Sequence, residues 1–179
     1  YWTLNTTPWG SAGYVHKNLQ NITWEQFGAH WEPWQTTLWA NDSGKKATFR
    51  WTAPENGVYQ VDALFTGNGI SANNADVYIV ARGSEIIKSG YLTGYYYDGN
   101  VQPGDYLTHS GTLNLFAGDT IDFIAGNGGA GSGYLVGIDA TITLTGGLTY
   151  WCGDAQTVFL SGDIDKNCYV NIHDLTELA

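Results

Sequence analysis

Lysine and arginine are scarce in this sequence: seven Lys and Arg stand against 17 Asp and Glu, which gives a formal net charge of −10. Nucleic acids bind through clustered cations that neutralise phosphates, so DNA and RNA are poor partners for this chain. Anionic membrane surfaces are disfavoured for the same reason. The sequence also lacks an apolar run near the roughly 20 residues that a membrane-spanning helix needs.

Methionine is absent, and the chain begins at Tyr1. We interpret this start as that of a mature or excised product from which a signal peptide has been removed. The only cysteines, Cys152 and Cys168, suggest one disulfide, which closes a loop of roughly 15 residues and contributes about 3 kcal/mol. Two free buried thiols are the alternative, whereas a cysteine metal site lacks a third soft ligand nearby. A disulfide predicts a secreted, periplasmic or cell-surface protein.

Catalytic motifs are missing as well. The sequence contains no G-x-S-x-G, H-E-x-x-H or C-x-x-C, and no motif singles out the two facing carboxylates of a glycosidase. The glycine-rich run 126–133 is not followed by the lysine of a phosphate-binding loop. The histidines lie far apart in the sequence and are more typical of surface or capped residues than of ligands: His16, His30, His109 and His173. We therefore predict that the protein is not an enzyme.

Helical periodicity is almost absent before Asp174, whereas short alternating stretches recur between Gly-rich turns. The expected strands are residues 47–52, 58–66, 76–82, 85–88, 112–116, 121–125 and 134–144. In the second of these, we expect the core face to carry Tyr59, Val61, Ala63 and Phe65. The pattern predicts an all-β fold, an antiparallel β-sandwich of jelly-roll type over residues 1–145. Residues 146–179 then form a separate tail.

The tail carries oxygen ligands at the spacing of a calcium loop. Counted from Asp163, positions 1, 3, 5, 9 and 12 are side-chain ligands, and the carbonyl of Tyr169 can serve position 7. The predicted Ca²⁺ ligands are Asp163, Asp165, Asn167, Tyr169, Asn171 and Asp174. A short helix would begin at Asp174. A solvated acidic turn without metal is the alternative, but such a turn has no reason to space its carboxylates in this way.

Two positions depart from an EF-hand loop. Position 6 is Cys168 where an EF-hand has Gly, and position 12 is Asp174 where Glu is usual. With both features the segment resembles a single dockerin repeat, the calcium loop and helix of secreted bacterial proteins. Dockerins carry two such repeats and bind cohesin partners, whereas this chain has one repeat.

Three sequence runs carry a second resemblance. They are W-T-A-P-E-N-G-V-Y from residue 51, L-F-A-G-D-T-I-D-F from residue 115 and G-I-D-A-T-I-T from residue 137. Together they resemble a recurrent secreted bacterial β-sandwich module, similar to carbohydrate-binding modules and to surface-layer or adhesion domains. The resemblance spans about residues 47–145. It implies a sandwich fold, and its motifs are mostly structural turns and a final strand.

Aromatic residues exceed what one small core needs, with 8 Trp and 12 Tyr. Exposed rings suit sugar stacking or subunit contacts. Consecutive tyrosines on a strand point to opposite faces, so at least one of the run 95–97 should be exposed. The candidate glycan or partner contacts are Trp31, Trp34, Trp39, Tyr95, Tyr96 and Tyr97. Three N-x-S/T triplets also offer candidate glycosylation sites, at Asn5, Asn21 and Asn41.

The N-terminal arm, residues 1–19, decides between two functions. The first 40 residues are rich in tryptophan, and such an apolar segment must fold back on its own sandwich or dock on a neighbour, for example by adding a strand to an open sheet edge. We expect docking on a neighbour, which predicts a non-catalytic, calcium-stabilised structural subunit that assembles with its own copies or with other surface proteins. The alternative is a carbohydrate-binding module that stacks polysaccharide on exposed aromatics.

Overall fold

The computed structural model describes residues 2–4, 14–19, 21–26, 29–40, 46–69, 74–97, 99–129 and 134–147. The chain divides into a first unit, residues 1–146, and a second unit, residues 147–179. The described residues form strands and turns and include no helix, so no helix long and apolar enough to cross a membrane is found among them.

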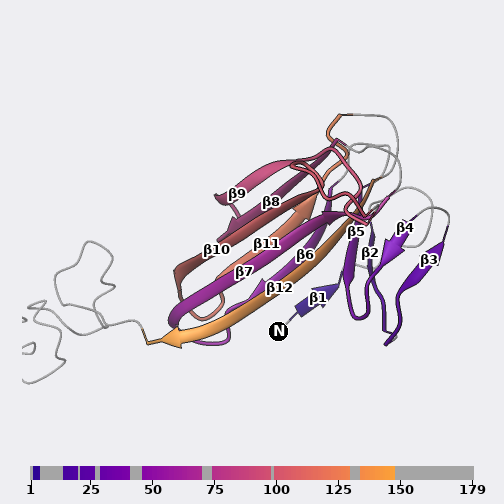
Figure 1. Cartoon of the computed structure of the whole chain (residues 1–179). Coiled ribbons are helices and arrows are strands. Elements are labelled where there is room, and N and C mark those ends of the chain that lie inside the picture. Colours follow the sequence, from indigo (N-terminus) through magenta and orange to yellow (C-terminus); the bar gives the residue numbers. More distant parts are fainter. Residues whose placement is uncertain are drawn as a thin grey trace, which may run out of the picture. The chain divides into compact units, whose positions relative to one another are not determined.

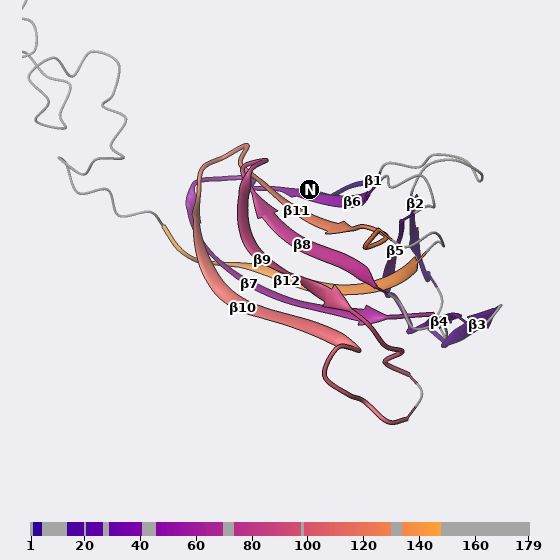
Figure 2. The ribbon, with the colours of Figure 1, turned by 90° about the horizontal axis from the view of Figure 1, so that it is seen from above.

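The described residues of the first unit form two five-stranded sheets, besides one hairpin (Figure 1). One sheet has the order β1-β6-β11-β8-β9, with bounds Trp2–Leu4, Ala47–Thr52, Thr120–Ala125, Ala75–Ala81 and Glu85–Leu92. The other has the order β10-β7-β12-β5-β2, with bounds Tyr106–Leu115, Gly57–Gly67, Tyr134–Gly146, Thr36–Ala40 and Tyr14–Lys17. A separate hairpin pairs β3, Trp24–Gln26, with β4, Ala29–Trp31. Every pairing is antiparallel, and Figure 2 shows the two sheets as two layers.

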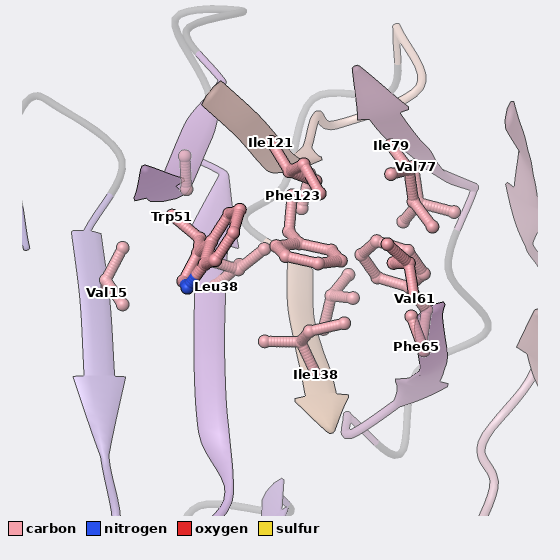
Figure 3. Close-up of a cluster of buried hydrophobic side chains, with 14 of the residues drawn as sticks. Val15, Leu38, Trp51, Val61, Phe65, Val77, Ile79, Ile121, Phe123 and Ile138 are labelled. Atoms are coloured by element: carbon pink, nitrogen blue, oxygen red, sulfur yellow. The ribbon is translucent and has the colours of Figure 1, made fainter. Parts of the chain in front are cut away.

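The core lies between the two sheets, where side chains of alternate residues meet. Tyr59, Val61, Ala63 and Phe65 of β7 are all buried, which confirms the core face predicted from alternation. Phe65 approaches Phe123 of the opposite sheet with ring centroids 6.3 Å apart (Figure 3). The predicted antiparallel sandwich is therefore confirmed for the described residues.

Strand β10 begins earlier than the alternation indicated. We expected a strand over residues 112–116, whereas β10 runs from Tyr106 to Leu115 and pairs with β7 along its whole length. Its exposed positions alternate with half-buried ones, but the half-buried set includes His109 and Gly111. Because neither residue is a large apolar one, this half of β10 lacks the alternation of apolar and polar residues that predicts a strand.

The N-terminal arm does not support the docking that we expected of it. Strand β1 pairs with β6 in one sheet, and β2 pairs with β5 in the other, both within the same chain. The described parts of residues 1–19 therefore fold back on their own sandwich and extend both of its sheets. An open sheet edge of the same chain satisfies the backbone groups of each strand without the entropy cost of associating two molecules. Pairing within the chain is therefore favoured over docking on a neighbour.

Candidate binding site

A tight turn before β5 presents an exposed tryptophan side chain, that of Trp34. The amide of Gln35 donates to the carbonyl of Glu32 at 3.1 Å, which closes a four-residue turn with Pro33 and Trp34 at its centre. Proline favours the first central position of such a turn, but Trp34 has a φ of 64°, where type II turns usually need Gly. The indole is 55% exposed. The chain thus accepts backbone strain at a residue whose ring faces water.

The buried amide of Asn18 holds this turn from one side. Its backbone amide donates to the carbonyl of Gln35 at 2.9 Å. Its side-chain nitrogen donates to the carbonyl of Glu32 at 3.0 Å and to that of Ile22 at 2.9 Å. The backbone and the side chain of Asn18 together therefore tie both ends of the turn to the segment that follows β2.

The buried side chain of Gln35 holds the turn from the other side. Its Oε1 accepts from the amide of Glu32 at 3.2 Å and from Nδ2 of Asn68 at 2.8 Å. Its Nε2 donates to Oγ1 of Thr66 at 3.3 Å and to the hydroxyl of Tyr97 at 2.9 Å. Every strong hydrogen-bonding position of this amide is used, so the turn is anchored to the end of β7 and to the loop after β9.

Asn68, which is fully buried, completes the network. Its Nδ2 also donates to the carbonyl of His30 at 2.7 Å, while its Oδ1 accepts from the hydroxyl of Thr66 at 2.8 Å. The network fits against Gly137 of β12, because a Cβ there would lie closer than 3.0 Å to side-chain atoms of Thr66, Asn68 and Gln35. A glycine at this position is what leaves room for three polar side chains.

A cluster of rings lies beyond Gln35. The ring of His30 stacks on that of Tyr97 with centroids 3.8 Å apart, and its Nε2 lies 3.0 Å from Oε1 of Glu32. Tyr95 and Tyr96 each meet Tyr97 edge to face. Burial raises the pKa of Tyr97, although its hydrogen bonds with Thr66 and Gln35 oppose this. The phenol therefore stays neutral near pH 7 and takes part in the amide network as a hydroxyl.

A cleft of about 310 Å³ opens on the other side of the turn. It is lined by Lys17, Trp34, Thr36, Phe49, Ile138, Asp139 and Ala140. Lys17, Thr36 and Ile138 are neighbours in register across β2, β5 and β12, and Phe49 comes from the opposite sheet. The cleft therefore combines two aromatic rings and an apolar floor with one cationic and one anionic residue, a composition typical of small-ligand sites.

The six predicted contact residues take different positions. Trp34 is exposed and lines the cleft, whereas Trp31, three positions earlier, is buried. Trp39 is half-buried, and so are Tyr95, Tyr96 and Tyr97 in the ring cluster. The three buried amides, Asn18, Gln35 and Asn68, were not predicted, because polar residues in apparent loops carry no periodic signal. The order Pro33-Trp34 was the available sign of a turn.

Other predicted sites fall outside the described residues. These are the six calcium ligands, both cysteines of the predicted disulfide, and the glycosylation candidates Asn5 and Asn41. The third candidate, Asn21, is exposed at a bend. Within the described ranges, no group of three or more His, Cys, Asp or Glu side chains is placed to hold a metal ion. The calcium loop and the disulfide therefore stay predictions.

Comparison with known proteins gives fold neighbours but no family. No protein-family model matches the chain, and no curated protein matches it. A family 35 carbohydrate-binding module from an environmental isolate is 20% identical, with 57% of this chain and 72% of that one covered and a TM-score of 0.34. A family 27 module of Caldicellulosiruptor saccharolyticus, in complex with mannohexaose, is 9% identical over 74% and 81%, with a TM-score of 0.43.

An enzyme is among the neighbours too. A cyclase from Fischerella sp. TAU is 14% identical, with 83% of this chain and 91% of that one covered and a TM-score of 0.41. Identity and TM-scores are low for all three. The case for a function therefore rests on the residues of the site.

Proposed function

We propose that the sandwich is a carbohydrate-binding module whose ligand stacks on Trp34. The observation that carries the proposal is an exposed indole held in a left-handed turn position at a cleft. A backbone in this region costs of order 1–3 kcal/mol for a residue other than Gly, so it persists only where the surroundings enforce it. A strained, solvent-facing tryptophan is hard to explain by folding and is readily explained by binding.

The cleft has the chemistry that a sugar ring needs. One face of a pyranose is apolar and packs on an aromatic ring, while its hydroxyls need both donors and acceptors. Trp34 and Phe49 offer rings, Lys17 offers a donor, and the hydroxyl of Thr36 offers an acceptor. Because Asn18 and Gln35 fix the turn from both sides, little order has to be imposed on Trp34 when a ligand binds.

A binding role fits the cleft better than a catalytic one. Among its seven lining residues, Asp139 is the one carboxylate, whereas glycoside hydrolysis generally uses a pair. The structural-subunit hypothesis depended on an arm that docks on a neighbour, and β1 and β2 instead pair within their own chain. Secretion remains part of the proposal, since a module that binds structural polysaccharides finds its ligand outside the cell.

The test is loss of binding on removal of the indole. Wild-type protein and Trp34→Ala are run through native gels that contain β-glucan, β-mannan or xylan. Each polysaccharide that slows the migration of the wild-type protein is then titrated into both proteins by calorimetry. We expect Trp34→Ala to bind at least tenfold more weakly, equal to about 1.4 kcal/mol. The matched control is Tyr91→Ala, which removes a 60% exposed ring on β9 of the other sheet. Equal binding by wild type and Trp34→Ala, or no retardation by any polysaccharide, would overturn the proposal.

A further inference from the structure

Strand β12 has an open edge that begins at the cleft. From Val136 to Ile138 it is paired on both sides, with β7 and with β5. Beyond Ile138 it continues to Gly146 with β7 alone, as far as the described residues go. Alternate residues of a strand point their N–H and C=O groups to each edge. The stretch from Asp139 onward therefore offers both donors and acceptors beside the cleft.

An apolar row lies on the inner face of β12 along the same stretch. The inward-facing residues of β12 become more exposed along the strand: Val136 is 0% exposed and Ile138 is 3% exposed, Ala140 and Ile142 are half-buried, and Leu144 is 43% exposed. Ile138 and Ala140 also line the cleft. The floor of the cleft thus continues as a strip of aliphatic side chains that opens progressively to solvent.

The other outer strands are short, charged or covered. Strand β1 has three residues, and β2 has four and carries Lys17. Strand β9 has a register irregularity and carries Lys88. It also lies close to β10, since Gly90 of β9 is next to the side chain of Leu107 of β10. Natural sheets protect their edges in these ways. The open stretch of β12 has β-branched and aliphatic residues after Asp139, without proline or lysine, and no described strand pairs with it on this side.

We infer that the ligand is an extended polysaccharide chain that crosses Trp34 and continues along the open edge of β12 toward Leu144. This inference rests on the proposed function and names the class of ligand. An extended chain of sugars presents apolar ring faces and rows of hydroxyl groups. The aliphatic strip matches the ring faces, and the unpaired backbone groups match the hydroxyls. A site for a single terminal sugar would need no surface beyond the cleft.

An extended peptide could also add to an open strand edge. The exposed indole at the start of the strip favours a sugar chain, because strand addition by itself needs no aromatic platform. Binding of an unstructured peptide is therefore the alternative outcome of the test.

Chain length separates these cases without any mutation. Gluco-, manno- and xylo-oligosaccharides with β-1,4 links, from disaccharide to hexasaccharide, are titrated into the wild-type protein by calorimetry. We expect affinity to rise several-fold beyond the disaccharide. Within residues 139–145, we also expect exchange of the amides that point away from β7 to slow with the hexasaccharide and not with the disaccharide. Equal affinity along the series would overturn the inference and leave the proposed function standing. Protection, without ligand, of the amides that point away from β7 would overturn it as well.

Leu144→Asp supplies a second readout at the far end of the strip. Its affinity for the hexasaccharide should fall several-fold, while its affinity for the disaccharide stays as in the wild type. Ile86→Asp, on an exposed residue of β9, is the matched control for the added charge, and melting curves check that both variants fold. A Leu144→Asp protein that binds both ligands normally contradicts the inference. Binding of unstructured peptides but of no saccharide overturns both the inference and the proposed function.

Discussion

Gln35 donates its side-chain amide to the hydroxyl of Tyr97 at 2.9 Å, although 62 positions separate the two residues. This hydrogen bond joins the turn that carries Trp34 to the ring cluster on the loop after β9. Through Thr66 and Asn68 the same amide reaches the end of β7. The exposed indole is thus supported by a buried polar network, so the stability of that network and the geometry of the cleft should change together.

Removal of Asn68 should destabilise the sandwich. Asn68→Ala leaves the carbonyl of His30, Oε1 of Gln35 and the hydroxyl of Thr66 each short of a partner in a buried region. We expect the free energy of unfolding to fall by roughly 1–3 kcal/mol, measured by urea denaturation. Asn114→Ala, at an exposed position of β10, should stay within about 0.5 kcal/mol of the wild type. Equal midpoints for the two variants would contradict the role given to the network.

Strain at Trp34 predicts a difference between two variants that both lack the indole. Trp34→Gly relieves the left-handed backbone, whereas Trp34→Ala keeps it. The greater freedom of Gly in the unfolded chain offsets part of the gain. We expect Trp34→Gly to be more stable than Trp34→Ala by about 1 kcal/mol, while both lose polysaccharide binding. Chemical denaturation measures the first quantity and calorimetry the second. If Trp34→Gly were the less stable, the strain would not be real.

Gly137 should tolerate no side chain. A Cβ at this position would collide with Thr66, Asn68 and Gln35, whereas nothing lies within 4 Å of the Cβ position at Gly146 on the same strand. Gly137→Ala should therefore lose roughly 1–3 kcal/mol of stability, as overpacked sites do, and Gly146→Ala should lose little. Thermal melting of the pair gives the comparison. Similar melting temperatures would mean that the network can move aside.

The sandwich and its core face were predictable because burial repeats with the period of a strand. Tyr59, Val61, Ala63 and Phe65 alternate with more exposed residues, and one local pattern was enough. Exposure of the tryptophans was not predictable in this way. Trp31 and Trp34 stand three positions apart with the same chemistry, yet one is buried and the other exposed.

The hydrogen-bond network that supports the site could not be predicted for a different reason. Gln35 finds its partners 31, 33 and 62 positions away, in strands whose arrangement must be known first. The arm shows the same limit. Its aromatic content predicted burial, but the choice between its own sandwich and a neighbour's depends on which sheet edges are open, and β6 and β5 offered them.

His109 should make stability depend on pH. Its Nε2 is buried without a hydrogen-bond partner in the described structure. Burial lowers the pKa of His109, the charge of Lys88 lowers it further, and Asp62 opposes them. The unfolded chain therefore takes up the proton first, so stability is intact above about pH 6.5 and falls as pH drops through the folded-state pKa.

His109→Gln removes this titration and keeps a polar side chain of similar length. Urea denaturation from about pH 7.5 to about pH 5 should show a steeper loss of unfolding free energy for the wild type than for this variant. Two parallel curves would show that another group is responsible.

The calcium loop predicted in the tail is tested by direct binding. Asp163, Asp165 and Asn167 supply hard oxygen ligands at alternate positions, so chelator-treated protein should bind one Ca²⁺ in calorimetry. Asp165→Ala should abolish this heat, whereas Asp62→Ala, on an exposed position of β7, should not change it. If the ion binds only the folded loop, calcium at about 100 times its dissociation constant should add about 2.7 kcal/mol to the stability of the tail. Absence of heat in the wild type, or normal binding by Asp165→Ala, would show that the spacing of these carboxylates serves some purpose other than metal binding.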